Sequence, residues 1–236
     1  MKLFQIKDNI WVSEYEEERD RPALGYIQGK KYSVAIDAGH SIDHIHEFYE
    51  ALEKEGLPLP SLTILTHWHW DHTFAMHGVR GLTIANQKTD EYLREFIYQM
   101  SPESDKIFLH MDPTIEKEYE DGKPLVVVPA DIVFEKQMRI DAGDEEILLS
   151  TCTSPHTDDS TLVYLPKEKI LFFGDARSGI FPTWKADPKL LEEFIKTMKD
   201  SKAELFAGGH WPVYRREDFL KELEESLEEA KALQSE

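Results

Sequence analysis

The sequence predicts an α/β or α+β fold in which two β-sheets pack together with helices outside. Short β-rich runs, bounded by Gly, Pro or Asp-Asn, recur along the chain. They fall into two successive groups, each followed by helical segments. Hydrophobic residues make up 41% of the 236 residues, which is enough for a sizeable core. A chain of this length fits one large domain or two small ones.

The first half of the chain carries six predicted strands and two predicted helical stretches. The strands are expected at residues 2–6, 10–14, 24–29, 32–39, 62–66 and 83–86. A helix is expected over residues 42–55, because Ile45, Phe48 and Leu52 then share one face. Residues 89–120 are mostly helical in pattern, and two prolines interrupt them.

The second half repeats this plan. Strands are expected at residues 132–135, 137–142, 146–151, 161–166, 169–175 and 204–209, the first three as a meander. Helices are predicted over residues 187–200 and from about residue 216. The last helix has an apolar stripe formed by Leu220, Leu223, Leu227, Ala230 and Leu233. We expect that stripe to pack on its own domain rather than in a coiled coil.

The charge balance disfavours some partners. The chain has 27 basic and 46 acidic residues, a formal net charge of -19, which repels phosphate backbones and anionic membranes. We therefore expect a small-molecule substrate rather than nucleic acid or membrane. The single cysteine, Cys152, excludes a disulfide within the chain, and the N-terminus lacks an apolar signal core. These features predict a cytoplasmic protein.

The main chemical signal is the run HWHWDH at residues 67–72, directly after an apolar strand. Histidine together with aspartate suits zinc, iron or manganese. On an extended segment, His67 and His69 point the same way and can bind one ion. Asp71 and His72 come at the following turn and can reach a second ion. A histidine-rich surface loop is the other interpretation, but it does not explain a carboxylate in this register.

Three further candidates, His156, Asp175 and His210, each follow a short apolar strand. Taken singly, Asp175 could cap the following segment and His156 could be a turn residue. Taken together they favour a metal site, since ligands gather at strand ends in layered sheet proteins. Gly208 and Gly209, before the last histidine, permit a close backbone approach.

In order along the chain, HWHWDH, SPHT, FFGD and GGHW resemble the motifs of the metallo-β-lactamase superfamily. The resemblance implies an α/β fold, a four-layer αβ/βα sandwich, with residues 1–236 as one such domain. It implies two divalent metal ions, zinc foremost, with iron or manganese as alternatives. The implied ligands of the first ion are His67, His69 and His156. Those of the second ion are Asp71, His72 and His210, with Asp175 bridging the two. Asp37 resembles an acidic residue that the family places below the site.

The resemblance implies a metal-dependent hydrolase acting on a small-molecule ester, lactone, thioester or amide. A hydroxide bridging the ions would attack the substrate, and Asp71 would accept its proton. Three alternatives stay open: a phosphodiesterase or nuclease on the same binuclear site, a mononuclear iron oxidoreductase similar to persulfide dioxygenases, and a non-catalytic protein that holds metals. A bridging Asp175, where related β-lactamases often have cysteine, favours the hydrolase branches with a carboxylate there.

The sequence offers two interpretations of the remaining aromatic residues. One of Trp68 and Trp70 is expected in the core and the other at the site. Phe181, Trp184 and Trp211 form either an aromatic pocket or ordinary packing, and residues 89–120 form either a lid or part of the core.

The other notable side chains have ordinary explanations. His40, His44 and His46 are expected to be exposed to solvent. Arg177 is expected to form a surface salt bridge, and Cys152 to be a small buried residue.

Overall fold

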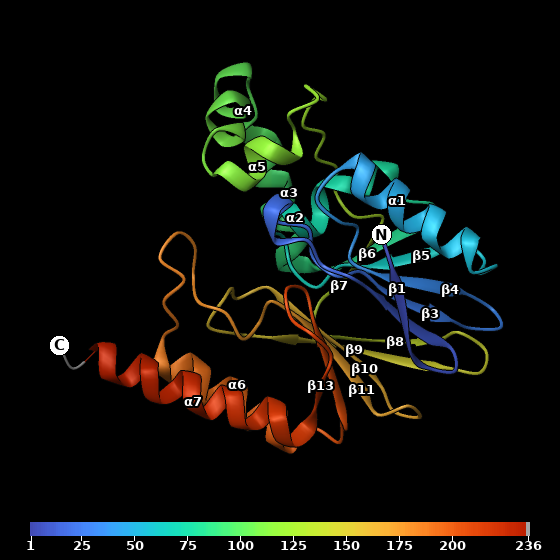
Figure 1. The fold of residues 1–236 in the computed structure, drawn as a ribbon, viewed down its shortest axis with the longest axis vertical. Helices are drawn as coiled ribbons and strands as arrows, with labels where there is room; N and C mark the ends of the chain where they lie inside the picture. Colours follow the sequence, from blue (N-terminus) through green and yellow to red (C-terminus); the bar gives the residue numbers. More distant parts are fainter. Residues whose placement is uncertain (235–236) are drawn as a thin grey trace.

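Two β-sheets packed face to face form the centre of the computed structural model, which describes residues 1–234 (Figure 1). Helices α1 to α5 lie on the outer side of the first sheet, and α6 and α7 on the outer side of the second. The predicted four-layer αβ/βα sandwich is therefore confirmed. Within the described residues, no helix is both long enough and apolar enough to span a membrane.

The first sheet has seven strands that follow one another in chain order. They are β1 (Leu3–Lys7), β2 (Ile10–Ser13), β3 (Gly25–Gln28), β4 (Ser33–Ile36), β5 (Leu62–Ile64), β6 (Leu82–Asn86) and β7 (Ile132–Phe134). Strands β1 to β4 pair antiparallel, and β4 to β7 pair parallel. Each parallel pair is joined by a crossover containing helix, as parallel strands require.

The second sheet has six strands in the order β13-β12-β11-β10-β9-β8. Their bounds are β8 (Gln137–Asp141), β9 (Glu146–Cys152), β10 (Ser160–Leu165), β11 (Ile170–Gly174), β12 (Leu205–Gly208) and β13 (Tyr214–Arg215). Only β11 and β12 pair parallel, and helix α6 joins them. Their carboxyl ends therefore open at the same edge of the sheet.

Five of the helices, α1 and α3 to α6, begin where the sequence supplies a side-chain cap or a proline. They are α1 (Ile42–Lys54), α2 (Trp70–Thr73), α3 (Gln87–Gln99), α4 (Pro102–Leu109), α5 (Pro113–Glu118), α6 (Pro188–Asp200) and α7 (Arg216–Gln234), with 3-10 turns at Glu17–Arg19 and Phe74–Gly78. The side chain of Ser41 accepts from the backbone N–H of His44 and caps α1. Pro102 and Pro113 interrupt the helical stretch as predicted, because each begins a new helix at its first position.

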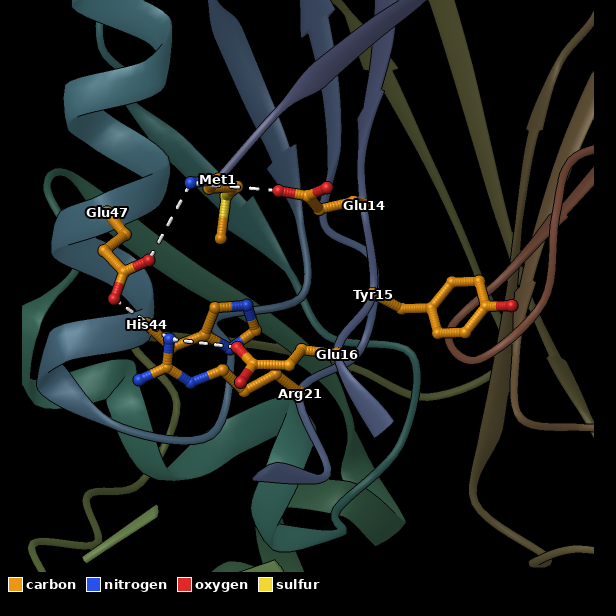
Figure 2. Close-up of a pocket in the computed structure, with 7 residues that line it drawn as sticks. All are labelled: Met1, Glu14, Tyr15, Glu16, Arg21, His44 and Glu47. Carbon is orange, nitrogen blue, oxygen red and sulfur yellow. Dashed lines mark hydrogen bonds and ion pairs between the residues drawn. The ribbon is translucent and has the colours of Figure 1, made fainter. Parts of the chain in front are cut away.

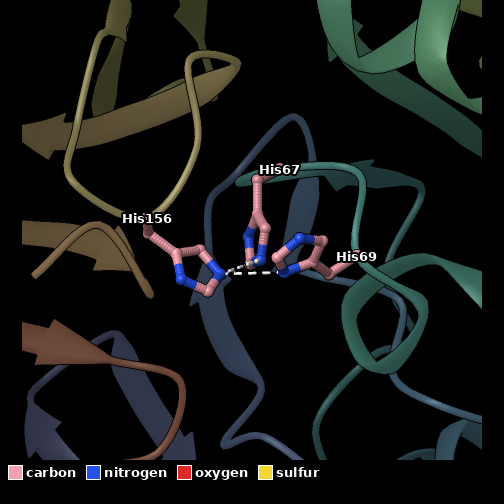
Figure 3. Close-up of side chains that lie close together, drawn as sticks. All are labelled: His67, His69 and His156. Atoms are coloured by element: carbon pink, nitrogen blue, oxygen red, sulfur yellow. Dashed lines mark hydrogen bonds between the residues drawn. The ribbon is translucent and has the colours of Figure 1, made fainter. Parts of the chain in front are cut away.

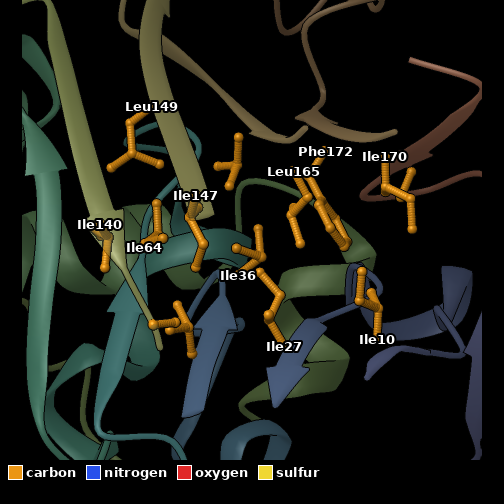
Figure 4. Packing of buried hydrophobic residues seen from close by; sticks show 14 of the residues in the cluster. Ile10, Ile27, Ile36, Ile64, Ile140, Ile147, Leu149, Leu165, Ile170 and Phe172 are labelled. Atoms are coloured by element: carbon orange, nitrogen blue, oxygen red, sulfur yellow. The ribbon is translucent and has the colours of Figure 1, made fainter. Parts of the chain in front are cut away.

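The main core lies between the two sheets (Figure 4). Ile27 and Ile36 of the first sheet are buried in the same cluster as Ile147, Leu165 and Phe172 of the second. Because both sheets contribute to this one cluster, it fixes how they face each other.

The predicted meander of three strands is wrong in its first member. Strand β7 pairs parallel with β6 in the first sheet, and only two residues separate it from β8, which belongs to the second sheet. The chain therefore crosses between sheets at this short link. Hydrophobic alternation identifies strands but does not say which strand is the partner.

His40, His44 and His46 were expected to be exposed to solvent, and this prediction is wrong for two of the three. His40 and His44 are fully buried, whereas His46 is exposed. The start of α1 points into the protein, where His44 Nδ1 accepts from the backbone N–H of His40 at 3.2 Å. In the last helix, the predicted stripe packs on α6 and the second sheet except at Leu233, which is 56% exposed.

Candidate metal centre

Three imidazole nitrogens converge at the edge of the sandwich (Figure 3). His156 Nε2 lies 3.2 Å from His67 Nε2 and 2.8 Å from His69 Nδ1. All three side chains are buried. His67 and His69 lie between β5 and α2, and His156 lies in the loop between β9 and β10, so both sheets contribute to the group.

A second group lies directly beside the first, since the rings of His67 and His72 are 4.2 Å apart. Asp71 Oδ2 lies 3.0 Å from His72 Nε2 and 2.9 Å from His210 Nε2. Asp175 Oδ1 lies 3.4 Å from His72 Nε2. The four ligand atoms lie within 4.8 Å of one another, as do those of the first group, so each group could hold a metal ion.

The sheet edge explains why distant residues meet here. Asp175 follows β11 and His210 follows β12 by two residues, at the carboxyl ends of the two parallel strands. Gly174 ends β11 with φ 53°, a conformation that glycine adopts without strain. All seven candidate residues from the sequence are thus brought together in two adjacent groups.

Asp37 organises the base of the site from the end of β4. Its Oδ1 accepts from the backbone N–H of Thr66 at 2.7 Å, and its Oδ2 accepts from the Thr66 hydroxyl at 2.9 Å. The same Oδ2 lies 2.8 Å from His72 Nδ1. A carboxylate at this distance holds the proton on Nδ1, so that Nε2 is the nitrogen of His72 directed into the second group.

Two other histidines are oriented in the same way. His156 Nδ1 donates to the carbonyl oxygen of Gly179 at 2.9 Å, and His67 Nδ1 lies 3.2 Å from the Thr66 hydroxyl. Because that hydroxyl already donates to Asp37, it accepts from His67. Both imidazoles therefore turn an Nε2 lone pair inward, the arrangement that metal binding needs.

The two groups differ in their protonation when no metal is bound. Burial lowers the pKa of His67 well below its ordinary value and that of His69 to about 3, so both are neutral. Burial alone would also lower the pKa of His210, but the carboxylates of Asp175 and Asp71 raise it to about 9. Against the effect of burial, the carboxylates of Asp71, Asp37 and Asp175 also raise the pKa of His72 well above its ordinary value. A metal ion entering the second group must therefore displace protons from both histidines.

The residues fit metal ions by two further observations. His72 Nε2 and Asp175 Oδ1 are buried and make no hydrogen bond of regular geometry, although they lie 3.4 Å from each other and His72 Nε2 lies 3.0 Å from Asp71 Oδ2. Gly209 packs so closely that an added Cβ would clash with Asp175 Oδ1 and lie 2.8 Å from His72 Cε1. Unpaired buried atoms are costly unless something coordinates them. Imidazole with carboxylate donors suits divalent zinc, iron or manganese.

Comparison with known proteins decides the family. The model of the metallo-β-lactamase superfamily matches residues 23–210, which include all seven candidate residues. The chain belongs to the metallo-β-lactamase superfamily. The family was predicted from four short motifs, and this prediction is confirmed.

Solved structures of this superfamily share the fold. A metallo-β-lactamase from Pontibacter korlensis has a TM-score of 0.69 at 18% identity, over 96% of this chain and 98% of that chain. A B3 metallo-β-lactamase with an active-site glutamic acid has a TM-score of 0.71 at 14% identity, over 100% of this chain and 92% of the other. The sec-alkylsulfatase Pisa1 from Pseudomonas sp. has a TM-score of 0.70 at 14% identity, over 98% of this chain but 41% of the longer sulfatase.

Two pockets open beside the candidate metal centre of this superfamily member. The larger, about 590 Å³, is lined by Trp68, His69, Trp70, Tyr92, Phe96, Phe108, Met111, Thr153, Ser154, His156, Thr157, Asp158, Ile180, Phe181 and Leu190. The smaller, about 170 Å³, is lined by Asp20, His69, Trp70, Asp71, Asp175, Ser178, Trp184, His210 and Trp211. Both tryptophans of the HWHWDH run therefore line a pocket, and Trp70 is buried between the two. Helices α3 and α4 supply one wall of the larger pocket.

Asp20 is a site residue that the sequence did not reveal. It follows the first 3-10 turn in a left-handed conformation with φ 49°, and its Oδ2 accepts from Trp70 Nε1 at 3.0 Å. Burial and the nearby charge of Asp71 raise its pKa to about 7. Asp20 lies in a charged run before the first motif, so no spacing pattern links it to Trp70.

Arg177 and Cys152 lie outside the candidate site. Arg177 forms the predicted salt bridge, with Glu222 at 2.9 Å, although its side chain is only 10% exposed. Its guanidinium lies over the ring of Trp211 at 5.4 Å. Cys152 is partly buried against the α6 and α7 layer, and burial raises its pKa to about 11.

A third pocket lies between α1 and the N-terminal strands and is lined by no candidate metal ligand (Figure 2). Arg21 pairs there with Glu47 at 3.0 Å and with the buried Glu118 at 2.7 Å. These pairs tie the loop after β2 to α1 and α5. His44 lines this pocket, and Tyr15 points away from the other side chains. We interpret this group as a brace for the loop that carries Asp20.

Proposed function

We propose that this protein is a binuclear metal-dependent hydrolase of a small-molecule ester, lactone, thioester or amide. The observation that carries the proposal is the convergence of seven histidine and aspartate side chains in two adjacent groups. Structural zinc sites are usually closed by four ligands, whereas two neighbouring, pocket-lined groups are typical of catalysis. We also propose that residues 1–236 form one domain, because both sheets contribute to one core and to both groups.

Our ligand assignment follows the two groups. His67, His69 and His156 would hold one ion, and Asp71, His72 and His210 would hold the other. Asp175 is proposed to bridge the ions, because its carboxylate lies 3.4 Å from His72 and 3.5 Å from His210 of the second group, and its charge also acts on His69 and His156 of the first. The donors suit divalent ions, and we propose zinc, with iron or manganese as alternatives.

In the proposed hydrolysis, the metal ions and the protein side chains have separate roles. When bound, two divalent ions supply an activated water and polarise the substrate carbonyl. Asp71 is proposed to take up the proton of the attacking water at Oδ1, since its Oδ2 faces both His72 and His210. Trp68 and Trp70 line the approach and keep bulk water from the reacting carbonyl.

A metal-loading experiment with Asp71→Asn tests this proposal. The variant is expected to lose at least about a hundredfold in hydrolysis of an ester, lactone or thioester panel, because the carboxylate base is gone. Metal content is measured in parallel to separate loss of base from loss of metal. Oxygen uptake without hydrolysis by the loaded wild-type protein would instead indicate an oxidoreductase and overturn the proposal.

Phosphodiester hydrolysis is a weaker candidate. Neither pocket beside the candidate ligands is lined by an arginine or lysine, within the residues that the structure describes. The formal net charge of -19 also opposes a polyanionic substrate. A phosphodiester in the same panel provides the comparison.

A further inference from the structure

We propose that the larger pocket binds an uncharged, apolar acyl group of the substrate, aliphatic or aromatic. This inference rests on the proposed hydrolase function and names the substrate class. It implies that the scissile carbonyl sits at the candidate ligands while the acyl group extends away from them between helices α3 and α4 and the loop of residues 178–186.

The pocket walls are aromatic and mutually packed. Trp68 lies 5.9 Å from Tyr92 and 6.4 Å from Phe96, measured between ring centroids. On the opposite side, the ring of Trp70 lies 5.4 Å from Phe181, edge to face. Packed aromatic rings hold a pocket open in the free protein, and a volume of about 590 Å³ is within the range of small-molecule sites.

The pocket is continuous with the first candidate metal group. His69 and His156 are among its lining residues, and the ring of His69 stacks on Trp70 at 5.3 Å with an interplanar angle of 27°. A carbonyl carbon placed at these histidines therefore has one substituent directed into the aromatic pocket. The other substituent faces the smaller pocket, where Asp20 and Asp175 line the wall.

The charged residues around the larger pocket indicate that the bound acyl group is uncharged. The larger pocket is lined by no lysine or arginine of the described chain, and its one carboxylate, Asp158, is already paired. Lys88 Nζ lies 2.5 Å from Asp158, and the Tyr92 hydroxyl donates to it at 2.8 Å. A substrate carboxylate in this pocket would be desolvated without a lysine or arginine partner in the lining, whereas methylene or aryl groups would gain by burial.

The mouth of the pocket is also apolar. Met111 and Ile180 both line it while remaining 40% and 53% exposed. These two side chains extend the apolar lining of the pocket to the protein surface. They allow an acyl chain to continue outward past the aromatic walls.

The first arm of the test measures hydrolysis of p-nitrophenyl acetate, butyrate, hexanoate and octanoate by the metal-loaded protein. We expect kcat/KM to rise by up to about fourfold per methylene, the full value for burial of a CH₂. The ω-carboxylate analogue of the hexanoate ester is expected to be at least about tenfold slower than hexanoate, because its charge is desolvated. A flat chain-length profile, or no penalty for the carboxylate, would overturn the inference while leaving the hydrolase proposal intact.

A matched pair of variants localises the effect. Ile180→Lys places a cation at the pocket rim and is expected to narrow or reverse the preference for hexanoate over its carboxylate analogue. Ile107→Lys makes the same change on α4, at a residue that is 72% exposed and does not line the pocket, and should leave the preference unchanged. An equal shift in both variants would show that surface charge, not the pocket, sets the preference.

Binding of hydroxamates gives a readout independent of turnover. Acetohydroxamate and octanohydroxamate carry the same metal-binding group, so their affinity ratio for the metal-loaded protein, measured by calorimetry, reports on the tail alone. We expect octanohydroxamate to bind at least about tenfold more tightly, with the preference reduced in Ile180→Lys. If octanohydroxamate binds more tightly but the protein hydrolyses none of the esters, the hydrolase proposal is rejected and the apolar pocket is retained. Equal affinities would reject the pocket.

Discussion

Asp37 shows how a single side chain prepares the candidate metal centre. It fixes Thr66 through two hydrogen bonds and holds the Nδ1 proton of His72. Asp37→Ala is expected to weaken metal binding by roughly 10- to 100-fold, since the imidazole loses its orienting partner. Metal titration monitored by calorimetry measures this. Asp43→Ala, at a surface residue of α1, is the control, and equal affinities in the two variants would contradict the role of Asp37.

Asp20 is expected to position Trp70 rather than to react. In Asp20→Ala the buried indole N–H loses its acceptor, which should cost about 1–3 kcal/mol of unfolding free energy. Asp20→Asn keeps an acceptor and should cost less. In a Trp70→Phe background, Asp20→Ala should also lower the unfolding free energy by less, because the indole N–H donor is absent. Additive losses in that double-mutant cycle, measured by denaturant unfolding, would refute the pairing.

Site residues could be predicted from the sequence only where they stand next to one another or next to an apolar strand. His67, His69, Asp71 and His72 are contiguous, and the later candidates stand at ends of apolar strands. Asp20 could not be found in this way, because its partner lies 50 positions along the chain. The buried His40 and His44 looked like surface residues for the same reason: their environment depends on α5 and the loop after β2.

At the scale of elements, the turn after β12 sets the spacing of the second group. Gly209 leaves no room for a Cβ beside Asp175 and His72. Gly209→Ala is therefore expected to reduce binding of one metal ion while the first group keeps the other. Elemental analysis after metal loading should give roughly one ion per chain, half the stoichiometry of a two-metal site. Gly56→Ala is the comparison for general destabilisation: its φ of 71° makes alanine strained there, but the added Cβ meets nothing within 4 Å and no candidate ligand. Full occupancy in Gly209→Ala would contradict this prediction.

Element positions were predictable, but some pairings were not. Periodicity located twelve of the strands and every long helix because each buries an apolar face. It missed β13, which has only two residues, and placed β7 in the wrong sheet. Strand partners depend on the packing of the whole sandwich, which local patterns do not encode.

At the scale of the whole molecule, the metal-free protein should respond to pH with a definite sign. The pKa of His210 is about 9 against an ordinary 6.5, so its stabilising contribution is complete below pH 6.5 and is lost as pH rises through 9. Asp20, whose pKa is raised from 3.8 to about 7, has the same sign, but its contribution is lost between pH 3.8 and 7, before that of His210. We therefore expect the Tm of chelator-treated protein to fall between pH 6.5 and 9.

The metal-loaded protein should behave differently over this range. Metal affinity rises with pH because protons compete less for His210, so the Tm difference between loaded and metal-free protein should widen. Thermal unfolding of both forms across this range measures it. A difference that stays constant or narrows would contradict the protonation state of the second group. The predicted cytoplasmic location is independent of this result and stays a prediction.

Metal content of the loaded protein, determined by elemental mass spectrometry, tests the central claim most directly. We predict about two divalent ions per chain, as a two-metal hydrolase site requires, with fewer in His69→Ala. Approximately one iron per chain and no second ion, or the same content in wild type and His69→Ala, would contradict the binuclear site.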